Sequence, residues 1–253
     1  MARHIHRFAS LTAFSLCALV GSVAFAQEPV APSEPAAPAP PAPAPPPPPS
    51  EAEVLTPGAP GSADAIADRV QAFYDQAKTY KAKFKQQFTI YAYNRTKNSS
   101  GEVVFSKPGK MRWTYTNNGN VVVSDNRHIK IYEKENRQMY LQTVDKTQYP
   151  AALSFLLGNG SLRKEFVLTK LDSTQFQFPG GYVLLGTPKS PTPSYQKILF
   201  YIDANTAQVR RVLLVDAQKN RNRFDFEEAR ANEAVQPTVF TFTPPAGTNI
   251  VRP

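Results

Sequence analysis

The acidic side chains of the segment Asn222–Glu228 are the residues whose spacing could perform chemistry. Asp225, Glu227 and Glu228 fall within four consecutive positions, and two neighbouring carboxylates can serve as general acid and general base in the hydrolysis of a lipid or a glycan. In an extended strand, however, Asp225 and Glu227 share a face with Arg223, which is typical of a ladder of paired surface charges. The segment therefore favours a charged surface, and a hydrolase remains the alternative from the enzyme class.

The other groups that catalysis commonly uses are scarce. Cys17 is the only cysteine, and it lies with two of the three histidines in an N-terminal segment that we expect to be removed. The third, His128, shares the polar face of an alternating strand with Lys130, as a solvated histidine does. A Gly-x-Ser-x-Gly elbow and a histidine-rich metal motif are absent from the sequence. We therefore predict no enzyme activity, no catalytic residue, no metal site and no cofactor.

The first 26 residues have the pattern of a cleavable export signal. Arg3 and Arg7 supply a basic start, Leu11–Val23 is apolar, and Ala24–Ala26 fits a small-x-small cleavage site. The apolar run is shorter than the ~20 residues that span a bilayer comfortably, although an uncleaved membrane anchor is the alternative. The pattern predicts a protein of the periplasm.

Residues 27–62 have the composition of a disordered linker. They contain 14 of the 24 prolines and four glutamates but no lysine or arginine. Runs of proline and alanine favour polyproline II over a packed core. The linker could be a spacer, an element that adheres to peptidoglycan or a passive tail.

Residues 63–253 are expected to form one basic domain. Without the two arginines of the leader and the four glutamates of the linker, this part carries 27 basic and 16 acidic side chains, a net charge of +11. Such a charge suits anionic lipid headgroups or acidic partner surfaces. Export argues against nucleic acid as a partner.

The domain begins with a predicted helix and a long strand. Ser62 is a suitable N-cap for a helix over Ala63–Lys78, whose apolar residues recur at helical spacing. From Tyr80 to Ala92 apolar and polar residues alternate, which indicates a sheet with one face toward an apolar interior and the other toward water.

Short alternating segments separated by turn signals predict an antiparallel sheet of about eleven strands, curled into an incomplete β-barrel. The further strands are expected at Gly101–Ser106, Lys110–Thr116, Asn120–Asp125, His128–Glu133, Gln138–Thr143, Lys164–Leu171, Gln175–Phe178, Tyr182–Thr187, Gln196–Asp203, Gln208–Ala217 and Arg221–Ala229.

One segment, Pro150–Gly158, is expected instead to be a short helix that is apolar almost all round. A barrel of this size could hold a ligand or simply be filled by side chains, and the pattern alone leaves both open.

Two motifs resemble the LolA-type carriers that ferry lipoproteins to the outer membrane. Phe105–Trp113 is similar to that family's Phe-x-Arg-Pro-x-x-Phe-x-Trp segment, and Phe240–Gly247 is similar to its final Phe-x-Phe-x-Pro-Pro-x-Gly strand. Phe84–Phe88, Val123–Asp125 and the apolar segment Pro150–Gly158 match further landmarks in the family's order.

The resemblance implies an open barrel whose helices cover an apolar concave face that binds acyl chains. It implies acylated lipoproteins or other amphiphiles as ligands, an inner-membrane lipoprotein-release transporter and an outer-membrane acceptor as partners, and a monomeric carrier. Lys107 stands where the family has the arginine of a lid clasp, and lysine lacks arginine's planar fork. The expected lipid-binding cavity is lined by Phe84, Phe88, Met111, Trp113, Leu153 and Leu156.

A different class of function also fits the same half-barrel. A lipid-sensing regulator or a cell-envelope binding module would need the same apolar interior as a carrier. Coupling to a release complex at the inner membrane would distinguish the carrier from the sensor.

Overall fold

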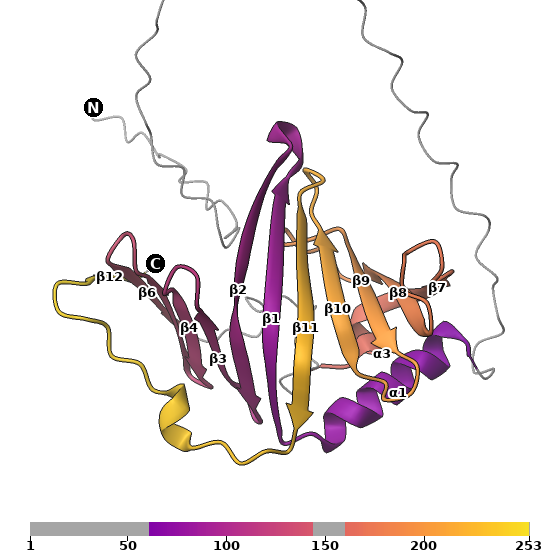
Figure 1. The fold of residues 1–253 in the computed structure, drawn as a ribbon, viewed down its shortest axis with the longest axis horizontal. Helices are drawn as coiled ribbons and strands as arrows, with labels where there is room; N and C mark the ends of the chain where they lie inside the picture. The colour runs from indigo at the N-terminus through magenta and orange to yellow at the C-terminus, as the bar shows by residue number, and fades with distance from the viewer. Residues whose placement is uncertain (1–60, 144–159, 253) are drawn as a thin grey trace, which may run out of the picture.

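The computed structural model describes residues 61–143 and 160–252, which form one long curled sheet with few helices (Figure 1). The sheet has twelve strands in the order β12-β6-β5-β4-β3-β2-β1-β11-β10-β9-β8-β7. Its two outermost strands, β12 and β7, are not paired with each other, so the sheet is open. The predicted mainly-β, incomplete barrel of about eleven strands is confirmed as an open sheet of twelve.

The helices are α1 (Ala63–Gln76), η1 (Tyr91–Tyr93), α3 (Leu162–Glu165) and η3 (Pro237–Phe240). The strands are β1 (Thr79–Ile90), β2 (Arg95–Ser106), β3 (Lys110–Tyr115), β4 (Val121–Asp125), β5 (His128–Glu133), β6 (Gln138–Thr143), β7 (Phe166–Leu171), β8 (Gly181–Pro188), β9 (Lys197–Asp203), β10 (Val209–Val215), β11 (Arg221–Ala231) and β12 (Asn249–Val251).

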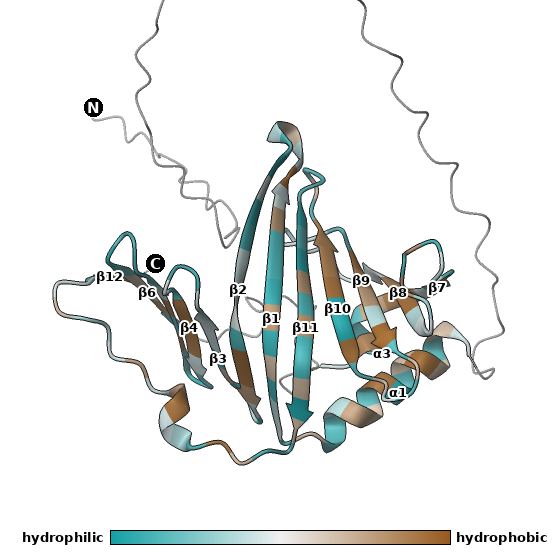
Figure 2. Ribbon diagram, viewed as in Figure 1, coloured by the Kyte–Doolittle hydropathy of each residue, from teal (hydrophilic) through white to brown (hydrophobic). Residues whose placement is uncertain are grey.

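Alternation of side chains gives the sheet two different faces. Along β1, buried residues alternate with exposed ones from Tyr80 to Phe88, and Figure 2 shows hydrophobic and hydrophilic bands alternating along β1 and β11. We call the face that carries Phe84 and Trp113 the inner face and the opposite one the outer face. All neighbouring strands are antiparallel except β12, which pairs in parallel with β6.

Helix α1 begins where the sequence predicts and packs against the inner-face core. The Ser62 hydroxyl accepts a hydrogen bond from the Ala65 N–H at 3.2 Å, which caps the first turn. Ile66, Ala67 and Val70 are buried in the same cluster as the inner-face side chains of the sheet. The expectation that helices cover the concave face as a whole stays a prediction, because the helices of the described ranges are few.

The outer face carries two smaller apolar clusters beneath irregular segments. Phe242 of the C-terminal segment packs over Val121, Val123, Tyr132 and Met139. Arg112 holds that segment by donating to the carbonyls of Val239 and Thr241, at 3.1 and 3.3 Å. The sheet is thus apolar on parts of both faces.

Two predicted strands are wrong. Gln175–Phe178 is a turn, in which the Phe178 N–H donates to the Ser173 carbonyl at 2.9 Å and Gln177 has a positive φ. Phe176 and Phe178 of this turn pack on the outer face of β8 and β9.

The C-terminal motif is also not a strand. Residues 241–248 have no regular structure, because Pro244 and Pro245 lack the N–H groups that a ladder needs. The short strand β12 follows the motif instead.

Several predictions concern residues beyond the described ranges. The proposed export signal, most of the proposed linker and the apolar segment Pro150–Gly158 lie outside them. Within 61–143 and 160–252, no helix combines the length and apolar character needed to cross a membrane. The same ranges contain no group of three or more His, Cys, Asp or Glu side chains that could hold a metal ion.

Candidate functional site

An aromatic cluster occupies the middle of the inner face, with Trp113 at its centre. The Trp113 ring lies 4.9 Å from that of Phe84 and 5.4 Å from that of Phe224, measured between ring centroids. Most of these contacts are edge-to-face, the arrangement that aromatic quadrupoles favour. We define the aromatic cluster as Phe84, Phe105, Trp113, Tyr115, Phe224 and Phe226, which come from β1, β2, β3 and β11.

Four of the six predicted cavity residues lie on this face. Phe84, Phe88, Met111 and Trp113 are all less than 9 % exposed. The strand register explains why, since Phe84 pairs directly with Phe226 across β1 and β11. Leu153 and Leu156 lie outside the described residues. The structure therefore brings Phe84, Met111 and Trp113 into one apolar cluster, whereas Phe88 lies further along β1, beyond the buried polar side chain of Gln86.

Gly101 leaves space for two rings of the aromatic cluster, a role that no pattern in the sequence indicates. It pairs with Phe84 on one side and with Tyr115 on the other, so the three residues form a row across β1, β2 and β3. A Cβ atom at Gly101 would lie 1.9 Å from the Thr114 carbonyl oxygen and 3.0 Å from the Phe84 ring. The Phe84 and Tyr115 rings, 5.1 Å apart, therefore meet above a position that tolerates no side chain.

Lys107 connects the β2–β3 turn to the end of α1. Its Nζ donates a hydrogen bond to the carbonyl of Tyr74, and its backbone N–H donates to the carbonyl of Lys78 at 2.9 Å. The Tyr74 carbonyl, in the last turn of α1, also accepts the N–H of the C-cap residue Ala77 at 3.2 Å, so the ammonium is its second donor. Partial burial lowers the pKa of Lys107, an effect that the nearby Asp75 carboxylate opposes.

Two buried tyrosines lie where α1 meets the sheet. The Tyr74 hydroxyl accepts a hydrogen bond from the Val209 N–H at 3.2 Å, and its ring lies 5.9 Å from that of Tyr80. Burial raises the pKa of Tyr74 well above its usual range and raises that of Tyr80 to about 12. Both phenols are therefore neutral at physiological pH.

We expect the free energy of unfolding to fall as the pH rises from about 10 to about 12. In that window the unfolded chain releases the Tyr80 proton while the folded chain retains it; below it both states hold the proton and the stabilisation is complete. In Tyr80→Phe the fall should be smaller by up to about 2–3 kcal/mol. Urea titrations across the pH series measure this, with Tyr93→Phe as the exposed control. Equal falls in all three proteins would contradict the assignment.

The carboxylates considered as catalytic candidates are paired on the outer face. Asp225 accepts hydrogen bonds from both Arg211 and Arg223. Glu227 and Glu228 form ion pairs with two lysines of β1, Lys85 at 2.7 Å and Lys83 at 2.8 Å. The charged ladder that the sequence predicted is present, and it lies on the opposite side of the sheet from the aromatic cluster.

His128 lies at the start of β5 beside an acidic turn. The Asp125 carboxylate accepts the backbone N–H groups of Arg127 and His128 at 2.8 and 2.7 Å. Although burial acts to raise it, these bonds hold the pKa of Asp125 below its ordinary value. The His128 Nδ1 is 3.8 Å from Asp125, and both side chains are more than two-fifths exposed. The histidine is thus part of a solvated turn.

Comparison with known proteins gives a consistent result. A family model for the outer membrane lipoprotein carrier protein LolA matches residues 75–243. An outer-membrane lipoprotein carrier protein of Methylibium petroleiphilum is 31% identical over 201 residues, which cover 78% of this chain and 93% of that protein.

A second carrier protein, from Nitrosomonas europaea, is 25% identical over 197 residues, which cover 76% of this chain and 91% of that protein. A crystal structure of a LolA superfamily protein from Nitrosomonas europaea aligns with a TM-score of 0.42 at 10% identity, covering 72% of this chain and 98% of that one. The family match and the first relative together show that the chain belongs to the LolA family of outer-membrane lipoprotein carrier proteins.

Proposed function

We propose that the protein binds the acyl chains of lipoproteins on its inner face and carries them from the inner to the outer membrane. The observation that carries the proposal is the aromatic cluster around Trp113, a continuous apolar surface on one face of a sheet that does not close. Membership of a family of lipoprotein carriers supports the same ligand class. Acylated lipoproteins are the proposed clients, and other amphiphiles share the chemistry.

The task of such a carrier is solubility, not catalysis. Each buried methylene is worth ~0.8 kcal/mol, so a long acyl chain held away from water represents on the order of 12 kcal/mol. An apolar surface supplies this free energy without any reacting group. The carrier also needs a means of lowering its affinity for the acyl chain at delivery.

The contact between Lys107 and α1 is the proposed lid clasp. It joins the β2–β3 turn to the C-terminal end of the helix that packs on the inner-face core. If acyl binding displaces α1, the clasp opens, and part of the binding free energy is used to open it. Closure then favours release, so transfer to a partner with higher affinity is downhill.

The remaining steps of the proposed route are export, loading at the inner membrane and delivery at the outer membrane. Export by the leader 1–26 would deliver it to the periplasm, with 27–62 as a linker ahead of the domain 63–253. An inner-membrane transporter would load it as a monomer, and an outer-membrane acceptor would receive the lipoprotein. The net charge of +11 on the domain suits anionic membrane surfaces at both ends of the route.

The clasp is tested with Lys107→Leu and Lys107→Arg. We expect the leucine variant to fold and to release a fluorescent acylated peptide at least about ten-fold more slowly, because a hydrogen bond from a charged group is worth ~1.5–3 kcal/mol and its loss favours the open, ligand-binding state. The arginine variant, which keeps a cationic donor, should release the peptide at or above the parent rate, because an intact clasp favours closure. Stopped-flow transfer from the loaded protein to acceptor vesicles measures the rate.

Lys197→Leu is the matched control, since Lys197 is exposed on the outer side of β9. If all the variants release like the parent, Lys107 is only a surface charge and the clasp lies elsewhere. If the parent protein fails to bind the acylated peptide at all, the carrier proposal itself is wrong. Binding without transfer to any acceptor would favour the lipid sensor.

A further inference from the structure

The hairpin between β1 and β2 ends in an exposed aromatic tip. Its turn is the short helix η1, and Figure 1 shows it extending beyond the neighbouring strands. Tyr91 is 55% exposed and Tyr93 is 74% exposed. Large apolar rings at the end of a protruding hairpin have no role in the core of the fold. We define the tip as residues 88–97 together with the adjoining turn 215–221.

The tip is held by specific hydrogen bonds. The Tyr91 N–H donates to the Asn220 side chain at 3.0 Å, which ties the hairpin to the β10–β11 turn. The Asn94 N–H donates to the Tyr91 carbonyl at 3.2 Å, with Asn94 in the left-handed conformation that asparagine tolerates. The two rings are thus presented on an ordered backbone, which lowers the entropic cost of using them in binding.

The tip also carries four cationic side chains. Arg95, Lys97, Lys219 and Arg221 are all exposed, and Asp216 is the sole acidic residue of the tip. The Asp216 carboxylate accepts hydrogen bonds from Asn220 within its own turn. The tip therefore carries a local excess of three positive charges.

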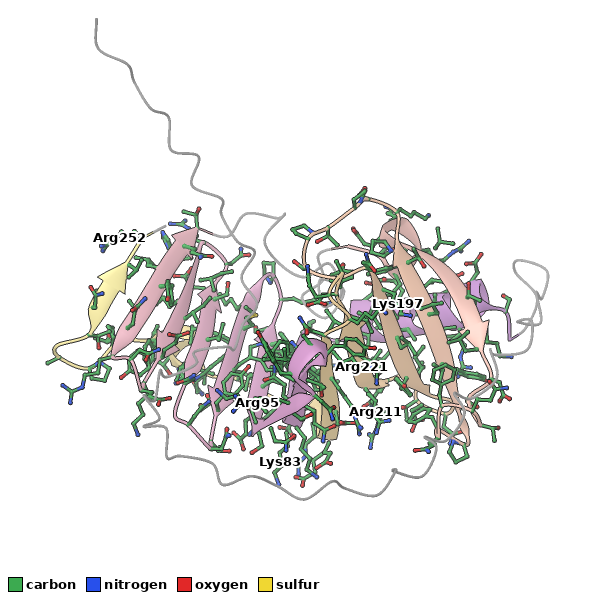
Figure 3. All side chains as sticks on the ribbon, turned by 90° about the horizontal axis from the view of Figure 1, so that it is seen from above. Lys83, Arg95, Lys197, Arg211, Arg221 and Arg252 are labelled. Carbon is green, nitrogen blue, oxygen red and sulfur yellow. The ribbon has the colours of Figure 1, made fainter. Side chains whose placement is uncertain are left out.

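The cations lie on both sides of the hairpin. Lys97 pairs with Phe88, an inner-face residue, whereas Arg221 pairs with Thr89 and belongs to the outer face. Figure 3, which looks down on this end of the sheet, places Arg95 and Arg221 on either side of the η1 ribbon. The Lys219 ammonium lies 5.4 Å from the centre of the Tyr91 ring. The positive charges thus lie on both faces of the tip, and one of them lies beside Tyr91.

We propose that this tip docks end-on to a bilayer surface that contains anionic lipid headgroups. Tyrosine is enriched at the boundary between membrane and water, where its ring enters the apolar region and its hydroxyl stays hydrated. Lysine and arginine beside it are attracted to anionic headgroups. An acidic protein surface would be contacted by one face of a hairpin, whereas charges on both faces suit a broad plane met by its end.

The docking site and the aromatic cluster are joined by one strand, β1. Phe88 lies at the base of the tip. Phe84 is buried on the same face of β1, four residues further from the tip. Docking would therefore orient the strand that carries both residues toward the lipid. This relation to acyl transfer rests on the proposed carrier function, but membrane docking of the empty protein does not.

Vesicle flotation tests the charge requirement. The protein without an acylated ligand is mixed with vesicles of phosphatidylcholine alone or of phosphatidylcholine with phosphatidylglycerol. We expect binding only to the anionic vesicles, reduced by salt and weakened about 25-fold by Arg95→Gln/Lys97→Gln, since each cation near the surface contributes about five-fold. Lys78→Gln/Lys81→Gln is the matched control: it makes the same change of charge at exposed positions near the opposite end of β1.

The tyrosines are tested separately. Tyr91→Ser/Tyr93→Ser should lose roughly ten-fold or more in binding to the same vesicles, because insertion of apolar rings is lost while the charge is kept. In Tyr93→Trp, lipids brominated in their acyl chains should quench the new fluorescence, whereas Trp113, which is 6% exposed, should be unaffected in the parent protein.

Two results would overturn the proposal: binding equally weakened by the control pair, or no quenching of Trp at position 93 on anionic vesicles. Binding of inorganic phosphate at the tip with no vesicle binding would assign the cations to a small anion instead. Vesicle docking with no acyl binding would leave the tip assignment intact and remove only the carrier function.

Discussion

Trp113→Ala should lower the free energy of unfolding by about 3–5 kcal/mol, the largest loss that we expect from a single truncation. The Trp113 ring contacts side chains from β1, β2 and β11, so its removal leaves a cavity that no single neighbour can fill. Trp113→Phe keeps an aromatic ring in the same position and should cost less than half as much.

Chemical denaturation monitored by circular dichroism measures these differences, since the variants lack the only tryptophan. Tyr93→Ala is the control, because it truncates an aromatic ring that is 74% exposed and should change stability by less than about 0.5 kcal/mol. Equal losses for Trp113→Ala and Tyr93→Ala would show that the aromatic cluster is not the stabilising core of the sheet.

Substitution of Trp113 also shows whether the aromatic cluster is only a packed core or a surface that binds acyl chains. If Trp113 contacts the acyl chain, Trp113→Phe should weaken binding of an acylated peptide while the fold persists. If the ring only fills the interior, stability falls and the affinity of the folded fraction stays constant. Measuring both quantities on one set of variants therefore shows which role the aromatic cluster has.

The sequence pattern correctly predicted those parts of the fold that depend on residues close together in the chain. The alternation along β1 identified its buried face, because a strand with one face in the core must repeat every second residue. The Ser62 cap located the first residue of α1 for the same reason, since the capping hydroxyl bonds within its own turn.

Prediction from the sequence failed where pairing between strands, and not the alternation of residues within a strand, determines the structure. The first half of β2, from Arg95 to Ser100, is polar, its first four residues are exposed, and no alternation of apolar and polar residues marks it as a strand. It is extended because it pairs residue by residue with the end of β1. Conversely, Gln175–Phe178 resembled a strand, but a turn places its aromatic rings on the outer face of the sheet.

The candidate site was predictable in its residue types but not in its contacts. Family resemblance suggested a clasp at Lys107, yet only the fold reveals that its partner is the Tyr74 carbonyl, 33 positions earlier in the chain. The role of Gly101 was invisible as well, because a glycine in a strand has no side chain to mark a face. Its importance lies entirely in the atoms of β1 and β3 that approach it.

Gly101→Ala should therefore destabilise the protein by about 3 kcal/mol, far more than an added methyl group in a strand usually costs. The new Cβ would overlap the Thr114 carbonyl oxygen at 1.9 Å, and a backbone atom cannot rotate away as a side chain can. To relieve the overlap, β2 and β3 must separate where the Phe84 and Tyr115 rings meet. The substitution should thus weaken acyl binding as well as stability.

Gly180→Ala is the matched control for this experiment. Gly180 has a positive φ of 75°, but a Cβ there would meet no atom within 4 Å. The substitution should lower the free energy of unfolding only by the strain of placing an alanine at a positive φ, about 1–2 kcal/mol, with no effect on acyl binding. Denaturant titration and acylated-peptide binding are measured on both variants. If Gly101→Ala is no more harmful than Gly180→Ala, the strands can separate at little cost, and the aromatic cluster does not depend on the close approach of β2 and β3.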